Sequence, residues 1–131
     1  MFTILVVDDE KVIRDGCKRI FTLEGYRVLT AANGREAMDI LVSELVDVVL
    51  CDLKMPVMCA LELMEEMELR HLDIPIIIIT GQGTIPNAVE CMRKGAYDFI
   101  TKPFRTDLLI MVVKNALEKL PPPPKFKTLP F

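Results

Sequence analysis

Four short apolar runs along the chain each stop abruptly at a polar residue. They cover residues 4–7, 46–51, 75–79 and 97–100, and the first three are rich in Ile, Val and Leu. A short aliphatic run that ends in this way is typical of a strand buried on both faces. A further short strand is predicted at 26–31, where the run ends in alanine. The pattern therefore predicts five strands.

Between these runs, apolar residues recur at the spacing of amphipathic helices. The first predicted helix ends at Gly25, and its apolar positions are Val12, Ile13, Cys17, Ile20, Phe21 and Leu23. Further helices are expected after an Asn33 cap, at about 60–70, from near Thr84 to Lys94, and from a Thr106 cap through Leu120. Each predicted strand is thus followed by a helix.

Strands that alternate with helices predict an α/β domain with a doubly wound, five-stranded parallel sheet and helices on both faces. The flavodoxin-like order 2-1-3-4-5 fits the chain, because it moves the second strand, which ends without a reactive side chain, away from the crevice beside strands one and three. Residues 1–120 are sufficient for one such domain.

Polar side chains stand at the ends of the other four strands. They are Asp8, Asp9, Asp52, Thr80 and Lys102. Because the carboxyl ends of parallel strands lie along one edge of the sheet, we expect these side chains to converge there. The sequence therefore predicts a site at that edge.

Three carboxylates held close together repel one another, and burying them unpaired is costly. Mg²⁺ suits such a site, because it prefers oxygen ligands and retains several waters. Three carboxylates, Mg²⁺ and Lys102 have charges that sum to zero, so the site would accept a phosphoryl group. Asp52, between the acid pair and Lys102, is the expected nucleophile, and Lys102 would neutralise charge on the transferred oxygens.

Composition and net charge further restrict the classes of function that fit the chain. The net charge of -3 provides no basic surface, so we expect no direct nucleic-acid binding by this domain. We expect no membrane span and no signal peptide, and hence a cytoplasmic protein. Residues 121–131 are read either as a plain tail or as a proline-rich linker to an output or kinase domain beyond Pro124.

The four cysteines lack zinc-binding spacing, so a zinc site is not expected. Cys17, Cys51 and Cys91 fall in strand or helix patterns and are predicted to be small core residues in a reducing compartment. Cys59 falls in a predicted loop, which makes it the thiol to test for reactivity.

With these motifs in place, residues 2–120 resemble the receiver domain of bacterial two-component response regulators. The resemblance rests on the stretches 5–10, 52–56, 80–81 and 102–104. It implies that Asp52 accepts a phosphoryl group from a sensor histidine kinase or a phosphotransfer protein. It also implies that the chain is no enzyme beyond catalysing its own phosphorylation and dephosphorylation.

The resemblance assigns roles to individual residues. Asp9, Asp52 and the backbone carbonyl of Lys54 would bind Mg²⁺ directly, and Asp8 would assist through water. Lys102 would pair with the phosphoryl group, and the peptide bond before Pro103 would be cis.

The resemblance also implies a switch. The hydroxyl of Thr80 would move to the phosphoryl group, and Phe99 would turn inward into the vacated space. This change would reshape the face made by the fourth helix, the fifth strand and the last helix. A homodimer through this face is a further expectation.

The chain departs from the family pattern after the phosphoacceptor. Val57, Cys59 and Ala60 stand where the family usually has glycine, aspartate and glycine. We expect the loss of an acid at 59 to remove a helix cap and the missing glycines to crowd the loop. Lys54 and Gln82 flank the expected path of a hydrolytic water, which predicts a long-lived aspartyl phosphate.

Two other functions remain open from the sequence. One is a non-phosphorylated interaction module of the same fold, which would bind neither Mg²⁺ nor a phosphoryl mimic. The other is a Mg²⁺-dependent phosphohydrolase that forms an aspartyl phosphate, although Lys54 occupies the position where such enzymes need a general acid. A flavin-binding role is not favoured, because no phosphate-binding loop follows the first strand.

Overall fold

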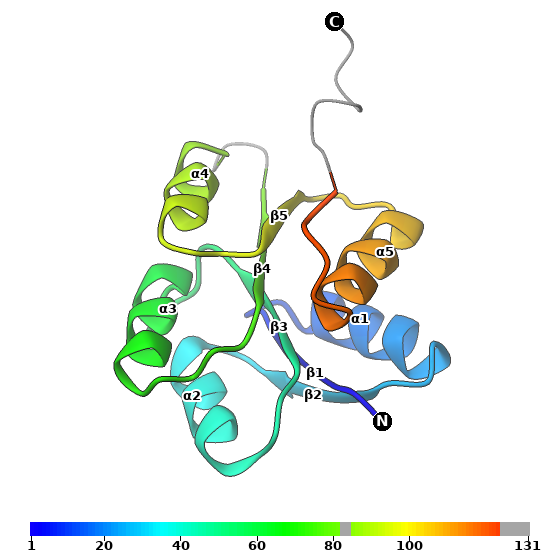
Figure 1. The fold of residues 1–131 in the computed structure, drawn as a ribbon, viewed down its shortest axis with the longest axis horizontal. Coiled ribbons are helices and arrows are strands. Elements are labelled where there is room, and N and C mark those ends of the chain that lie inside the picture. The colour runs from blue at the N-terminus through cyan, green and yellow to red at the C-terminus, as the bar shows by residue number, and fades with distance from the viewer. Residues whose placement is uncertain (82–84, 124–131) are drawn as a thin grey trace, which may run out of the picture.

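The structure, a computed structural model, describes residues 1–81 and 85–123. Within these ranges it contains one parallel sheet of five strands in the order β2-β1-β3-β4-β5 (Figure 1). The strands are β1 (Thr3–Val7), β2 (Arg27–Ala31), β3 (Val48–Asp52), β4 (Ile76–Thr80) and β5 (Asp98–Thr101). The helices are α1 (Lys11–Leu23), α2 (Gly34–Ser43), α3 (Ala60–Leu69), α4 (Ile85–Arg93) and α5 (Thr106–Leu117). The predicted strand order is confirmed.

Helices cover both faces of the sheet, because side chains alternate along each strand. Ile4 and Val6 of β1 face a core shared with α1 and α5. Leu5 and Val7 face the opposite core, which α2, α3 and α4 close. Figure 1 shows α1 and α5 together on one side of the sheet and α2 and α3 on the other. Two cores on one sheet explain why the central strands carry apolar residues on both faces.

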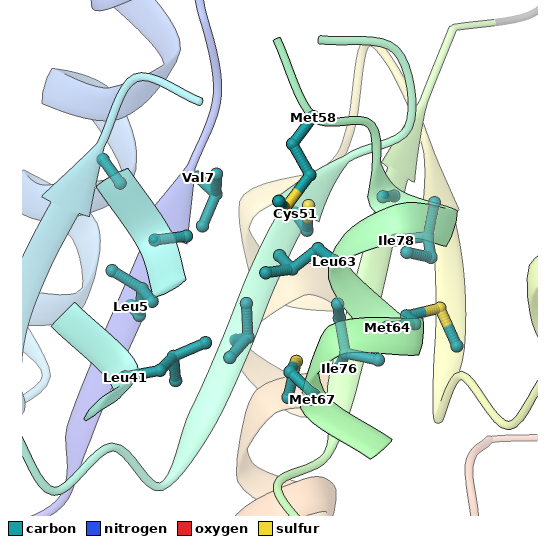
Figure 2. Packing of buried hydrophobic residues seen from close by; sticks show 14 of the residues in the cluster. Leu5, Val7, Leu41, Cys51, Met58, Leu63, Met64, Met67, Ile76 and Ile78 are labelled. Atoms are coloured by element: carbon teal, nitrogen blue, oxygen red, sulfur yellow. The ribbon is translucent and has the colours of Figure 1, made fainter. Parts of the chain in front are cut away.

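The core between the sheet and α3 contains several sulfur-bearing side chains. Figure 2 shows Met58 and Cys51 near Leu63, and Met64 and Met67 along the same helix. Methionine is flexible and fills irregular gaps between a helix and a sheet. This packing holds the segment after β3 against the body of the domain.

Several expectations about the helices need correction. Val12 and Leu23 were expected on the apolar face of α1, but their exposures are 72% and 77%. Cys17 and Phe21 are the buried residues of that helix.

Thr106 was expected to cap α5, but Arg105 occupies the cap position and Thr106 is the first helical residue. The expected Asn33 cap is confirmed, since its side-chain oxygen accepts the Glu36 N–H at 3.0 Å. The expected Thr84 cap lies outside the described residues.

The segment between β3 and α3 has a strained backbone at Val57, one of the positions where glycine was expected. Val57 has φ +74°, a left-handed conformation that is costly for a β-branched residue. The expected loss of a cap at position 59 is offset, because the Glu62 carboxylate accepts the Cys59 N–H at 3.1 Å. The segment therefore keeps a bonded helix start and carries backbone strain at Val57.

Cysteine placement matches the sequence prediction. Cys17, Cys51 and Cys91 are buried, and Cys59 is half-buried. Burial raises the pKa of the Cys17 thiol to about 11, with the negative charge of Asp8 adding to the effect.

No helix in the described part of the chain is long and apolar enough to cross a membrane.

Candidate functional site

The site lies at the carboxyl edge of the sheet, where four strands end. Asp8 and Asp9 follow β1, Asp52 ends β3 and Thr80 ends β4, while Lys102 follows β5. A cleft of about 370 Å³ opens at this edge. It is lined by Asp9, Glu10, Asp52, Leu53, Lys54, Gly81 and Lys102. The edge predicted from the strand pattern is therefore hollowed and lined by charged groups.

Asp8 is completely buried and held by the turn that follows it. Its Oδ1 accepts the Glu10 N–H at 2.9 Å, and its carbonyl oxygen accepts a hydrogen bond from Arg14 at 2.8 Å. Its own N–H donates to the Ala31 carbonyl at 3.1 Å. These bonds fix the acidic turn and leave Asp9 exposed at the cleft.

Lys102 joins the acidic groups of the site. Its Nζ lies 3.1 Å from Asp8 Oδ2, 3.3 Å from Glu10 Oε1 and 3.5 Å from Asp52 Oδ1. Burial alone would lower the pKa of Lys102, but the charges of Asp52 and Asp8 and the hydrogen bonds to Asp8 and Glu10 outweigh burial and raise it. Lys102 therefore remains a fixed positive charge beside Asp52. The expected cis peptide bond between Lys102 and Pro103 is also confirmed.

Asp52 is 8% exposed, and its environment disfavours its charge. Burial raises the pKa of Asp52 to about 6, and the neighbouring charges of Asp8 and Asp9 add to this effect, while Lys102 opposes it. The positive charge of Lys102 thus does not fully compensate the burial of the Asp52 carboxylate. Further positive charge in the cleft would favour the ionised, nucleophilic form.

The donor set fits a hard divalent cation. One carboxylate oxygen each from Asp8, Asp9 and Glu10 lie within 4.8 Å of one another. Together with Asp52 these acids supply four negative charges against the single positive charge of Lys102, and oxygen-only ligands suit Mg²⁺. Glu10 was not predicted to belong to the site. Counting it adds one negative charge to the predicted net charge of zero. The turn that aims Glu10 back toward Lys102 gave no signal in the sequence pattern.

Thr80 and Phe99 do not line the cleft. Thr80 is completely buried, and its hydroxyl donates to the Gly81 carbonyl at 3.1 Å. Phe99 is half-buried and packs against the core closed by α2, α3 and α4. Lys54 is exposed and lines the cleft, whereas Gln82 lies outside the described residues.

Comparison with known proteins assigns the family. The family model described as the response regulator receiver domain matches residues 4–114. The chain belongs to the response regulator receiver domain family. As a receiver domain it is a signalling module of two-component systems, and the resemblance stated from the motifs is confirmed.

Relatives of this receiver domain include longer regulators. The chain is 36% identical over 115 residues to the C4-dicarboxylate transport transcriptional regulatory protein DctD of Pseudomonas aeruginosa, and 37% identical over 115 residues to the regulatory protein AtoC of Escherichia coli. Each match covers 88% of this chain and 25% of the relative. The chain thus spans about a quarter of the length of these curated relatives.

A solved receiver domain matches this chain over nearly its whole length. The receiver domain of NtrX from Brucella abortus is 39% identical, with a TM-score of 0.84, and the match covers 88% of this chain and 98% of that one. The receiver fold accordingly accounts for nearly all of the described residues.

Proposed function

We propose that this receiver domain takes a phosphoryl group from the phosphohistidine of a sensor histidine kinase, or of a phosphotransfer protein, onto Asp52. The observation that carries the proposal is the position of Lys102, 3.1 Å from Asp8 and 3.5 Å from Asp52 at an open cleft. A cation there would stabilise the oxygens of a phosphoryl group attached to Asp52.

The transfer exchanges one bond for another. An Oδ atom of Asp52 forms a bond to phosphorus as the phosphorus–nitrogen bond of the donor histidine breaks, and the imidazole takes up a proton. Asp9, Asp52 and the Lys54 carbonyl would hold Mg²⁺ directly and Asp8 would assist through water, and the bound ion would supply positive charge to the phosphoryl oxygens. Glu10 lies close enough to Asp8 and Asp9 to join this set. Lys102 would keep its ion pair to Asp8 and bind the transferred group. The chain would then catalyse only its own phosphorylation and dephosphorylation.

The same proposal includes a switch through Thr80 and Phe99. The Thr80 hydroxyl now donates to the Gly81 carbonyl, so it would exchange that acceptor for a phosphoryl oxygen. Phe99 packs against the core on the α4 side and has no hydroxyl with which its side chain could form a hydrogen bond in either position. The change would alter the α4-β5-α5 face, through which we propose that two copies form a homodimer.

The proposal also covers the longer protein. The relatives are named as transcriptional regulators, which supports an output domain beyond Pro124, with residues 1–120 as the receiver and 121–131 as the linker. DNA binding would belong to that output domain. We propose the cytoplasm as the compartment, because the donor histidine of the kinase acts there.

The deciding experiment is an intact-mass measurement after incubation with acetyl phosphate and Mg²⁺. The wild-type chain should gain one phosphoryl group, and Asp52→Ala should gain none. Asp39→Ala changes an exposed acid on α2 and should behave like the wild type. A wild-type chain that gains no mass, or an Asp52→Ala chain that gains as much, would contradict the proposal. The first result would favour a non-phosphorylated interaction module.

A further inference from the structure

A hydrogen bond ties the start of β5 to the end of the domain. The hydroxyl of Tyr97, immediately before β5, donates to the carbonyl oxygen of Leu120 at 2.8 Å. The two residues are 23 positions apart in the chain. Leu120 comes three residues after α5 and directly before Pro121. The bond therefore acts where the chain leaves the folded domain.

The end of α5 is closed tightly around this point. Lys119 has φ +59°, and its N–H donates to the Ala116 carbonyl at 3.1 Å. The Leu120 N–H donates to the Asn115 carbonyl at 2.9 Å. This pattern is the left-handed closure that often ends a helix. With its N–H and its carbonyl both bonded, Leu120 is held on two sides.

The first three residues after Leu120 are prolines. Pro121 to Pro123 have fixed φ and no backbone N–H, which favours a stiff, extended stem. The direction of a stiff stem depends on the residue from which it starts. Because Leu120 is that residue, the Tyr97 hydroxyl helps to set where the stem points.

Tyr97 is also firmly attached to the sheet. Its N–H donates to the Ile76 carbonyl of β4 at 2.8 Å, and its ring packs against the core beneath α1 and α5. Phe99, two residues later, packs against the opposite core. One short strand thus joins the aromatic residue of the proposed switch to the residue that holds the stem.

We propose that Tyr97 is a positioning residue, which couples the state of β5 to the orientation of the stem that leaves the receiver domain. The coupling rests on the proposed function, since it needs a phosphorylation-dependent movement of β5. A change in the position of β5 would be passed through the Tyr97 hydroxyl to the Leu120 carbonyl. A phenyl ring at position 97 would keep the packing and lose this connection.

The contact itself is tested with Tyr97→Phe in the full 131-residue chain. Hydrogen exchange of the Lys119 and Leu120 amides should become about fivefold faster, the effect expected from loss of one hydrogen bond. Tyr26→Phe is the matched control, because Tyr26 packs in the same core with its ring 6.2 Å from Phe21, and no bond from its hydroxyl is seen within the described residues. Unchanged exchange in Tyr97→Phe would overturn the proposal.

The coupling is tested by loading the chain with beryllium fluoride and Mg²⁺ as a phosphoryl mimic and recording amide chemical shifts. In the wild type, Leu120 should shift on loading, and in Tyr97→Phe that shift should fall to less than half while the shifts near Asp52 stay the same. Loading that changes Asp52 but not Leu120 in the wild type would overturn the coupling and leave the phosphorylation proposal standing. A chain that does not bind the mimic at all would instead contradict the proposed function.

Discussion

Gly34 lies against Met58, so that a Cβ on Gly34 would stand 2.7 Å from both the Cβ and the backbone oxygen of Met58. The start of α2 is thereby packed directly on the segment after the proposed phosphoacceptor. Because a backbone oxygen cannot rotate away, Gly34→Ala should lower the free energy of unfolding by about 1–3 kcal/mol. Urea unfolding measures this change.

The matched control for that change is Gly16→Ala. Gly16 is an exposed residue within α1, and a Cβ there would meet nothing within 4 Å. Alanine should therefore stabilise the helix by about 0.5–1 kcal/mol. Equal effects of the two substitutions would show that helix propensity, and not contact with Met58, determines the result.

Replacing Val57 with glycine should stabilise the domain. Its φ of +74° is strained for a branched side chain, and the residue is 73% exposed, so little packing would be lost. Val57→Gly should raise the free energy of unfolding by about 0.5–1 kcal/mol after the entropy cost of glycine is included. The same substitution at Val42, an exposed residue within α2, should lower it by a similar amount.

The raised pKa of Asp52 predicts how stability depends on pH without divalent cations. Its folded-state pKa of about 6 lies above the ordinary value of 3.8, mainly because of burial. The contribution of Asp52 is therefore fully present below about pH 4 and is lost as the pH rises through about 6. Asp52→Asn should remove this loss and be more stable than the wild type at pH 7.5 by roughly 1–2 kcal/mol. Thermal unfolding at a series of pH values tests the difference between the two chains.

Mg²⁺ should reverse this instability, because it would bind the folded acidic cleft and not the unfolded chain. At a concentration 100 times its dissociation constant, the gain is about 2.7 kcal/mol. Asp9→Asn should lose most of the Mg²⁺-dependent rise in melting temperature, and Asp39→Asn, which changes an exposed acid on α2, should keep it. An equal rise in all three chains would indicate a general salt effect.

The phosphorylated form should decay slowly because of Lys54. This side chain is exposed and lines the cleft beside Asp52, where it would obstruct a hydrolytic water. Lys54→Asn should shorten the lifetime of the aspartyl phosphate several-fold, as followed by intact mass after removal of a small phosphodonor. Decay of the wild type as fast as that of Lys54→Asn would refute the role of Lys54. The companion prediction for Gln82 concerns a position outside the described residues.

Much of the fold could be predicted from the sequence, because strands that are buried on both faces consist almost entirely of apolar residues. Runs such as Ile76 to Ile79 are apolar at every position, which occurs when both faces of a strand are covered. The convergence of Asp8, Asp52 and Lys102 then followed from the geometry of parallel strands alone. Helix boundaries were less certain, since apolar residues near helix ends, such as Val12 and Leu23, remain exposed.

The details of the site depended on backbone turns, which apolar patterns do not encode. Glu10 reaches Lys102 because its N–H is bonded to Asp8 Oδ1, a local turn with no counterpart in strand or helix spacing. The hydrogen bond from the Thr80 hydroxyl to the Gly81 carbonyl could not be predicted from the apolar pattern either. The capping of α3 by Glu62 follows the three-residue spacing of a capping box, which the sequence from Cys59 to Glu62 contains.

The distribution of the cysteines makes the native chain convenient for spectroscopy. Three thiols are buried, and Cys59 is the half-buried one, seven positions after Asp52 and at the start of α3. A thiol-reactive fluorophore should therefore attach at this loop without prior removal of the other cysteines. Its emission would report events at the neighbouring cleft in real time, so the wild-type sequence already contains its own labelling position.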